Sequence, residues 1–544
     1  IGMSLDEPSG QPNPNRPVVF SLLAILIVYA VAAAAGWPQH ATSRILAAAH
    51  AGDAGEAKAD TRPGHGAAVR SEGKPPRRPN ESHRAQPPAA PAYWTVAPFV
   101  LLLGAIALLP LLHVSEHWWE SNLHKFLVAA GLGLATLTYY AVAHPHPVER
   151  HFLGHALVHP AGDVSWELPA AVLANAILQD FVPFIILLFS LYTISGGIRI
   201  QGDLPAHPLT NTAFITAGGL LASFIGTTGA AMLLVRPLLE TNSERKHVSH
   251  TVVFFIFVVC NCGGCLLPLG DPPLFLGYLQ GVDFLWTLSL WPQWLLVNAL
   301  LLAVYFAWDS LVSYPRETVQ DVLRDETRVR RMQFGGLWPN TLLLAGVVMA
   351  VGLLDTSKTL PGTDWHPWLY LREAVLLALV ACSLALGDPG VRQANRFNYG
   401  AIIEVAALFT GIFICMQPAL QILGVQGSRL GIDTPAEFFW ITGALSSVLD
   451  NAPTYLVFLE TGRALGAEGY TSMPHLGLPD RLLAAVSLGA VFMGANTYIG
   501  NGPNFMVKTI AEKSGVRMPS FFGYMVYSGA VLVPIFALVT YLFF

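Results

Sequence analysis

The feature that most constrains this chain is a succession of long apolar runs spread along its whole length. Runs such as 18–37, 96–114, 290–308 and 521–544 are nearly free of charged residues. A helix needs about 20 mainly apolar residues to cross the roughly 30 Å hydrocarbon core of a bilayer. Charged residues make up 12% of the chain, against about 25% in a typical soluble domain. The pattern therefore predicts an all-α polytopic membrane protein whose main partner is the lipid bilayer.

Two polar segments divide the chain. Residues 38–92 are rich in Ala, Pro, Gly and His, a composition that cannot bury a core and predicts a disordered extracytoplasmic loop. Residues 310–336 carry five arginines and are expected to form a cytoplasmic linker. The N-terminal segment 1–37 contains the apolar run 18–37, which fits either a cleaved signal peptide or a retained first transmembrane helix.

The two remaining parts, 93–309 and 337–544, present the same order of segments. Each is expected to contain three helices, a broken segment and two further helices. The broken segments, 212–240 and 436–460, are apolar but carry Gly, Pro, Thr or Asn at their centres, which is typical of re-entrant hairpins. Five crossings in each part would invert the second relative to the first. With the first helix, the sequence predicts about 11 transmembrane helices in two inverted transporter repeats, each with a re-entrant hairpin and a broken helix.

Positive charges in the loops predict the orientation of the chain. The loops on one predicted side hold Arg199, Arg236, Arg245, Lys246, the five linker arginines, Arg392, Arg396, Lys508, Lys513 and Arg517. The short loops on the other side hold Arg150, Lys358, Arg372, Arg429, Arg463 and Arg481. Cytoplasmic loops carry the excess of Lys and Arg. We therefore expect a cytoplasmic N-terminus and a location in a bacterial inner membrane.

Four acidic residues within apolar segments are candidates for proton or ion coupling: Asp180, Asp271, Glu404 and Asp450. A carboxylate at membrane depth is costly and is by default functional. Asp450 lies at the centre of the second hairpin, so we expect it to exchange H⁺ for Na⁺. Asp271 lies beside Pro272 and is expected to tune ion affinity or the pH response. The alternative for each acid is a structural role at a helix end or helix contact.

Polar uncharged residues gather at the same breaks in both parts of the chain. They are Thr227, Thr228, Asn261, Asn451, Thr454, Asn496, Thr497 and Asn501. Gly and Pro interrupt the helices there, and the freed carbonyls together with hydroxyl, amide and carboxylate oxygens suit Na⁺. The expected sodium ligands are Asp450, Asn451, Thr227 and Thr228. Interhelical hydrogen bonding is the alternative role for these polar side chains.

Two motifs resemble those of the ion transporter superfamily. They are Leu449-Asp-Asn-Ala-Pro-Thr454 and Asn496-Thr-Tyr-Ile-Gly-Asn-Gly-Pro-Asn504. Together with the repeated order of helix, hairpin and broken helix, they extend the resemblance over residues 95–544. The superfamily includes NhaD-type sodium/proton antiporters, arsenite carriers, citrate carriers and divalent-anion/sodium symporters.

This resemblance implies two sodium sites near the bilayer midplane, a homodimer and elevator-type alternating access. One implied site comprises Thr227, Thr228 and Asn261, and the other comprises Asp450, Asn451, Thr454, Asn496, Thr497 and Asn501. The first hairpin tip reads Gly226-Thr-Thr-Gly229, whereas dicarboxylate symporters of the superfamily carry Ser-Asn-Thr. This departure argues against their carboxylate chemistry.

The predicted function is secondary active sodium/proton antiport by a protein that is not an enzyme. The hairpin cores contain no Lys or Arg that could hold a substrate carboxylate, and no P-loop motif for ATP hydrolysis occurs. The alternative is a sodium- or proton-coupled carrier of citrate, a dicarboxylate or another organic anion or oxyanion. Small inorganic ions are the expected partners, Na⁺ is the expected coupling or transported ion, and neither an organic cofactor nor nucleic acid is expected.

Overall fold

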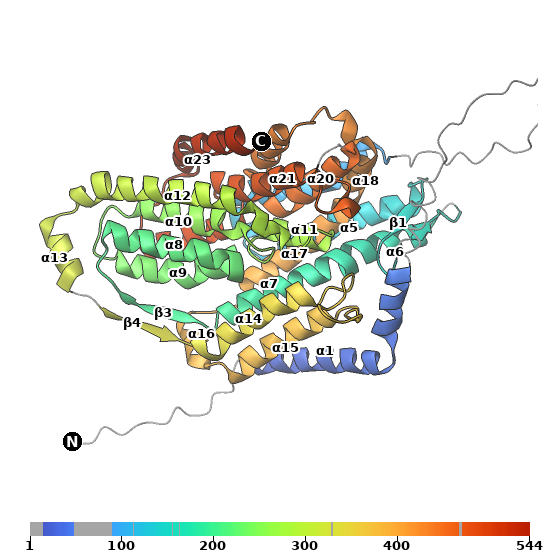
Figure 1. Cartoon of the computed structure of the whole chain (residues 1–544), viewed down its shortest axis with the longest axis horizontal. Helices are drawn as coiled ribbons and strands as arrows, with labels where there is room; N and C mark the ends of the chain where they lie inside the picture. Colours follow the sequence, from blue (N-terminus) through green and yellow to red (C-terminus); the bar gives the residue numbers. More distant parts are fainter. Residues whose placement is uncertain are drawn as a thin grey trace, which may run out of the picture.

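A computed structural model describes residues 15–47, 90–112, 114–154, 156–162, 164–327, 330–466 and 470–544. Most of these residues are helical, and many of the helices run along the long axis of the molecule (Figure 1). Among the described residues, six helices are long and apolar enough to cross a membrane, and the bent pair Gly400–Cys415 and Gln417–Arg429 makes a seventh. The chain is therefore a mainly helical polytopic membrane protein, as its apolar runs predict.

The first part of the chain contains a helical hairpin followed by a broken helix. Helix α1 (Arg16–Ala34) precedes this part. Its described helices are α3 (Ala97–Leu108), α4 (Glu116–Trp119), α5 (Asn122–Val142), α6 (Glu167–Leu173), the π-helical turn η3 (Ala174–Phe181), α7 (Val182–Ser195), α8 (Pro208–Ile225), α9 (Thr227–Thr241), α10 (Ser249–Val259), α11 (Pro272–Leu279) and α12 (Trp291–Trp308). The hairpin is formed by α8 and α9, which pack on each other and are joined by Gly226 alone. Gly226 has a φ of 81°, which favours glycine. Residues 260–271 separate α10 from α11 and contain the short turn η4 (Cys262–Cys265).

The second part contains the same two features. Its helices are α14 (Leu337–Leu353), α15 (Leu371–Leu386), α16 (Pro389–Ala394), α17 (Gly400–Cys415), α18 (Gln417–Gln426), α19 (Pro435–Ser446), α20 (Asn451–Leu465), α21 (Asp480–Met493), α22 (Gly502–Lys513) and α23 (Phe521–Phe543). The hairpin α19–α20 turns at 447–450, and the helix α21–α22 is broken around η10 (Gly494–Asn496). Thr434 begins α19 with a capping box, because its hydroxyl accepts from the Glu437 amide while the Glu437 carboxylate accepts from the Thr434 amide.

The hairpins and broken helices of the two parts are packed crosswise. Helix α9 of the first hairpin packs on α22, and α20 of the second hairpin packs on α11. The innermost helices are α10 and α21, whose residues from His250 to Val259 and from Leu482 to Met493 are all buried. Close packing at the breaks requires glycine. A Cβ on Gly500 would lie 2.6 Å from the Gly494 carbonyl oxygen and 2.8 Å from that of Ser446.

Two small antiparallel sheets depart from the all-α prediction. Strands β1 (Val148–Arg150) and β2 (Ala156–Val158) form one sheet, and β3 (Arg199–Asp203) and β4 (Arg330–Gly335) form the other. Strand β4 and helix α13 (Val319–Thr327) belong to the predicted linker 310–336, which thus returns to pair with the segment after α7. The strands are too short to show a clear alternation in the sequence. The sheet β3–β4 and α13 lie at one end of the molecule and β1 at the other (Figure 1).

The segment predicted as an extracytoplasmic loop is helical at its start. Residues 37–47 form a helix, and the remainder of the predicted loop up to residue 89 lies outside the described residues. The helix is held by packing against the second part of the chain, where the Thr42 hydroxyl accepts a hydrogen bond of 2.9 Å from the Leu369 amide. This contact joins residues far apart in sequence, so local composition gave no sign of it.

Candidate functional site

The crosswise packing encloses one carboxylate, that of Asp271. Its side chain is 1% exposed. Its Oδ1 accepts hydrogen bonds from the Thr227 hydroxyl at 3.0 Å and from the Asn501 amide nitrogen at 3.1 Å, and its Oδ2 accepts one from the Asn451 amide nitrogen at 2.7 Å. All three donors are uncharged. Within the described part of the chain, the carboxylate therefore has hydrogen bonds but no basic side chain to balance its charge.

Each of the four side chains stands at the start of a helix. Thr227 and Asn451 are the first residues of α9 and α20, whereas Asp271 and Asn501 are the N-cap residues of α11 and α22. Four helix N-termini thus meet at one point, where their dipoles favour negative charge. Prolines occur within the first three positions of three of these helices: Pro272 and Pro273 in α11, Pro453 in α20 and Pro503 in α22. They remove backbone donors that an anion would otherwise use.

A chain of asparagine side chains extends from Asp271 through the breaks. The Asn501 amide nitrogen also lies 2.9 Å from the Cys260 carbonyl oxygen and 3.3 Å from Asn261 Oδ1. The Asn261 amide nitrogen donates to Asn504 Oδ1 at 2.8 Å, and that of Asn504 donates to the Gly494 and Thr497 carbonyls. Asn504 was not among the predicted site residues, although it ends the motif that begins at Asn496.

A second polar group surrounds Ser447 at the turn of the second hairpin. The Asn496 amide nitrogen donates to the Ser447 hydroxyl at 2.9 Å, and the Thr497 hydroxyl donates to the Ser447 carbonyl at 2.5 Å. Asn496 Oδ1 is buried and has no hydrogen-bond partner among the described residues. In the first hairpin, Ser223 bonds in a similar way to the Gly263 carbonyl at 2.6 Å. Sequence reasoning missed both serines, because single serines occur throughout membrane helices.

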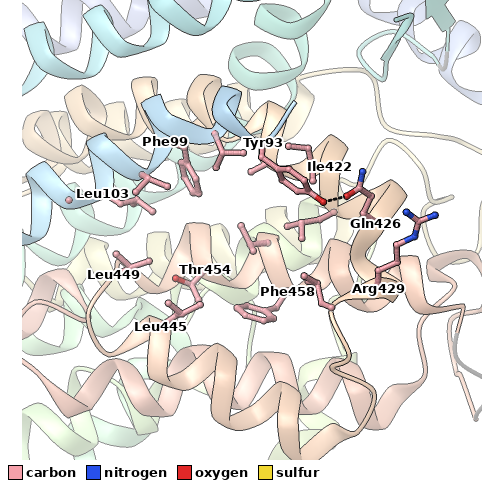
Figure 2. A pocket seen from close by; sticks show the side chains of 17 residues that line it. Tyr93, Phe99, Leu103, Ile422, Gln426, Arg429, Leu445, Leu449, Thr454 and Phe458 are labelled. Atoms are coloured by element: carbon pink, nitrogen blue, oxygen red, sulfur yellow. Dashed lines mark hydrogen bonds between the residues drawn. The ribbon is translucent and has the colours of Figure 1, made fainter. Parts of the chain in front are cut away.

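Asp450, expected to be the exchanging acid, caps its own helix. Its carboxylate accepts a hydrogen bond of 3.1 Å from the Ala452 amide, as an N-cap aspartate usually does. Its side chain is partly exposed. The Thr454 hydroxyl donates to the Asp450 carbonyl at 2.9 Å. Thr454 also lies on the wall of a largely apolar cavity of about 530 Å³ between α3, α18 and α20 (Figure 2).

Three further predicted site residues are not among the described hydrogen-bond partners of Asp271. Thr228 lines a small cavity of about 70 Å³ between the first hairpin tip, α7 and α17. Glu404 on α17 forms an ion pair of 2.6 Å with Lys125 on α5, and its side chain is 43% exposed. Asp180 in η3 accepts a hydrogen bond of 3.2 Å from Gln280. Asp271 and Gln280 flank the 8-residue helix α11, so the residue that Asp180 contacts lies about one helix length, roughly 12 Å along the axis, from Asp271.

Asp180 borders a large polar cavity. The cavity has a volume of about 810 Å³ and is also lined by Gln280, Arg372, Glu460 and Arg463. Arg463 donates to the Gln280 carbonyl at 2.6 Å and pairs with Glu460 at 2.5 Å. The C-terminal ends of α11 and α20 contribute to its wall, while the N-terminal ends of the same helices meet at Asp271. A water-accessible recess therefore lies one helix length from the buried carboxylate.

Comparison with known proteins identifies the family of the chain. Residues 89–544 match a family described as "Putative citrate transport". The chain is also 26% identical over 360 residues to the uncharacterized transporter Rv2684 of Mycobacterium tuberculosis, covering 63% of this chain and 77% of that protein. It is 25% identical over 357 residues to the uncharacterized transporter Rv2685 of the same organism, with the same coverage of each chain. The family match spans the hairpins, the broken helices and the helices around them, and the chain therefore belongs to the putative citrate transport family of membrane transporters.

Proposed function

We propose that the chain is a secondary active sodium/proton antiporter in which Asp271 binds Na⁺ and H⁺ in turn. The observation that supports this most directly is a buried carboxylate whose described partners are all uncharged. An isolated charge in an apolar interior is costly, so the site gains free energy when a cation or a proton neutralises it. Since both neutralise the same oxygens, binding of one excludes the other, and exclusive binding is the basis of exchange.

The neighbouring side chains can serve either occupant. With no ion bound, Thr227, Asn451 and Asn501 donate to the carboxylate. A proton on Oδ2 would make that oxygen a donor, and the Asn451 amide would then turn to accept with its own oxygen. For Na⁺, the Thr227 hydroxyl can turn to present its oxygen. Rotation of an asparagine amide by half a turn exchanges its NH₂ group for its oxygen. The site would then offer Na⁺ carboxylate, hydroxyl and amide oxygens.

The role first expected for Asp450 passes to Asp271 in this proposal. The Asp450 carboxylate is engaged with the backbone of α20 and is partly exposed, whereas that of Asp271 is bonded by side chains of both parts of the chain. Asp450 is retained as a second acid next to Asn451, where its charge would attract cations toward the site.

We further propose that the hairpins and broken helices move together across the membrane, as in an elevator, within a homodimer of inverted repeats. In this arrangement the chain has 11 transmembrane helices and a cytoplasmic N-terminus in a bacterial inner membrane. Support comes from the apolar cavities beside the two hairpin tips, which lie partly between the hairpins and α7 and α17 on one side and α3 and α18 on the other. Apolar contacts include few hydrogen bonds, so the hairpins could slide along these helices.

A second candidate function is the coupled transport of citrate or a related anion. The family description favours it, as do the four helix N-termini at the site, because such termini attract anions. The prolines at three of these termini weigh against it. So does the carboxylate of Asp271, which would repel a substrate carboxylate unless a cation bound first.

Proton flux in liposomes containing the purified protein tests the proposal. A pH-sensitive dye is enclosed and Na⁺ is added outside. Antiport predicts that Na⁺ alone enters in exchange for H⁺, so that the enclosed dye reports alkalinisation of the interior. Asp271→Asn should abolish this flux and Glu404→Gln should retain it. If Na⁺ alone has no effect but citrate drives uptake of labelled Na⁺, antiport is wrong and the anion carrier replaces it.

A further inference from the structure

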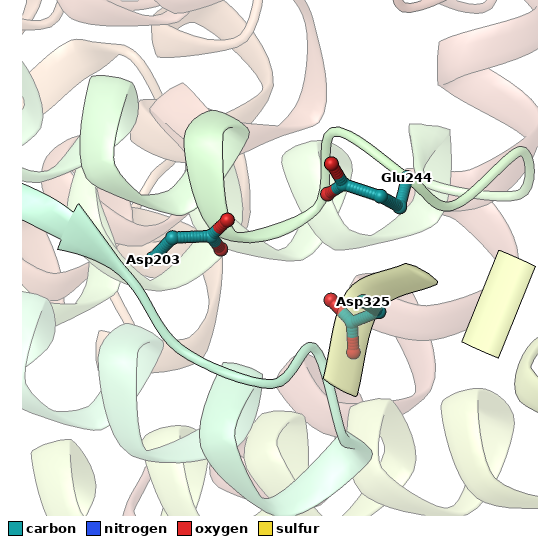
Figure 3. Close-up of side chains that lie close together, drawn as sticks. All are labelled: Asp203, Glu244 and Asp325. Atoms are coloured by element: carbon teal, nitrogen blue, oxygen red, sulfur yellow. The ribbon is translucent and has the colours of Figure 1, made fainter. Parts of the chain in front are cut away.

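Three carboxylates form a cluster at the end of the molecule that holds β3, β4 and α13 (Figure 1). Asp203 is the last residue of β3, Glu244 lies in the turn between α9 and α10, and Asp325 lies on α13. Figure 3 shows the three side chains directed toward a shared space. One oxygen from each carboxylate lies within 4.8 Å of the others.

The surroundings of Asp325 indicate that a ligand is needed. Its side chain is 4% exposed, and its Oδ2 accepts a hydrogen bond of 2.7 Å from the Ala206 amide. Its Oδ1 is buried and has no hydrogen-bond partner in the described part of the chain. Leaving a carboxylate oxygen buried and unpartnered costs free energy.

Basic residues beside the cluster are engaged with other acids. Arg245 binds Asp309 at 2.5 Å, and Lys246 binds Asp321 at 2.8 Å. Among the described side chains, none forms an ion pair with Asp325. Arg245 and His207 are near enough to act on this carboxylate electrostatically, but neither forms an ion pair with it.

We infer that Asp203, Glu244 and Asp325 bind a hard divalent cation, Mg²⁺ or Ca²⁺. Both ions take carboxylate oxygens at about 2.0–2.6 Å. Oxygens on opposite sides of one ion are then separated by about 4–5 Å, which the spacing of the cluster allows. The unpartnered Oδ1 of Asp325 supplies one ligand, and water completes the coordination.

Such an ion would join three segments that are distant in the sequence. It would tie α13, within the segment that connects the two parts of the chain, to β3 and to the turn at the base of the first hairpin. A divalent cation would therefore restrain the linker against the hairpin. This inference concerns a site separate from Asp271 and does not depend on the proposed antiport.

The test uses the purified full-length protein in detergent after treatment with a chelator. We expect isothermal titration with Ca²⁺ or Mg²⁺ to show saturable binding of one ion per chain at this site, and the unfolding temperature to rise with it. Asp325→Asn should weaken binding by about tenfold or more, because affinity depends on the number of charged ligands. Asp321→Asn is the matched control, since it changes an acid on the same helix that is engaged with Lys246. It should bind the ion as the unmodified protein does.

Two results would overturn the inference. One is that neither ion binds the unmodified protein or raises its unfolding temperature at millimolar concentration. The other is that Asp321→Asn weakens binding as much as Asp325→Asn. If Asp325→Asn fails to fold, Glu244→Gln replaces it, because Glu244 lies in a surface turn. Retention of full affinity in that variant would also exclude the site.

Discussion

Replacement of Asp271 by asparagine is expected to abolish Na⁺ binding while leaving the fold close to its original stability. The asparagine keeps one oxygen, which can accept from Thr227 and Asn501 as Oδ1 does now. Its NH₂ group faces the Asn451 amide nitrogen, and a half-turn of the Asn451 amide restores a hydrogen bond. The network of neutral bonds therefore survives the change.

The expected change in the free energy of unfolding follows from these bonds. A hydrogen bond to a charged group contributes about 1.5–3 kcal/mol and a neutral one about 1 kcal/mol. Replacing the hydrogen bonds to a charged group by neutral ones thus lowers the free energy of unfolding by a few kcal/mol. Removing a buried charge returns several kcal/mol, so Asp271→Asn should alter stability by no more than about 2 kcal/mol. Asp271→Ala instead leaves the donors of Thr227 and Asn451 unpartnered at about 1–3 kcal/mol each, while Asn501 keeps the Cys260 carbonyl, and the variant should be strongly destabilised.

Thermal unfolding in detergent measures both effects. Samples in NaCl and in choline chloride at equal ionic strength separate specific Na⁺ binding from screening. At a Na⁺ concentration about 100 times the Kd, the unmodified protein should gain about 2.7 kcal/mol. Asp271→Asn should gain nothing. A variant that folds, is still stabilised by Na⁺ over choline and still exchanges Na⁺ for H⁺ would refute the assignment of Asp271.

Three further predictions use other parts of the structure. In a Na⁺ titration of the liposome assay, Asn451→Ala should raise the Na⁺ concentration for half-maximal exchange about tenfold. This corresponds to a loss of about 1.4 kcal/mol in the free energy of Na⁺ binding. Asp309→Asn should destabilise the protein by about 3–5 kcal/mol in detergent unfolding, because it leaves the buried Arg245 guanidinium without the carboxylate at 2.5 Å. When a chelator has removed any bound cation, the pKa of Asp325, raised by burial, means that loss of its proton destabilises the folded protein. The free energy of unfolding should therefore fall as the pH rises above 3.8, the ordinary pKa of an aspartate. Asp325→Asn should lessen that fall and be the more stable protein at neutral pH, and a steeper fall in the variant would contradict the reasoning.

The membrane-spanning helices and their interruptions could be predicted because they depend on local sequence. Long apolar runs specify helices, and the Gly, Pro and Asn residues that interrupt them mark the hairpins and breaks. Thr227, Asn451 and Asn501 were predicted from this pattern, and the structure brings all three onto Asp271. What they do there is still a proposal.

The central position of Asp271 could not be predicted, because it depends on the crosswise packing of the two parts. The bond from Asn451 to Asp271 joins residues 180 positions apart, and no local pattern encodes such a pairing. Asp450 was predicted to be the exchanging acid because it lies in the hairpin turn, but an N-cap carboxylate accepts a hydrogen bond from its own helix. The partner of Glu404, Lys125, is also distant in the chain, by 279 positions.

The sharing of one carboxylate between the two parts of the chain bears on the stoichiometry of exchange. Asn451 and Asn501 of the second part reach the acid of the first part, so the proposed ion site exists only while both hairpins and both broken helices stay together. One carboxylate balances one monovalent charge. If Asp271 alone changes occupant, one Na⁺ is exchanged for one H⁺ and no net charge crosses the membrane. The rate of exchange should then be unaffected when a potassium gradient with valinomycin imposes a membrane potential on the liposomes. A rate that follows the imposed potential would show that a second group titrates during the cycle, and Asp450→Asn would reveal whether that group is the cap of α20.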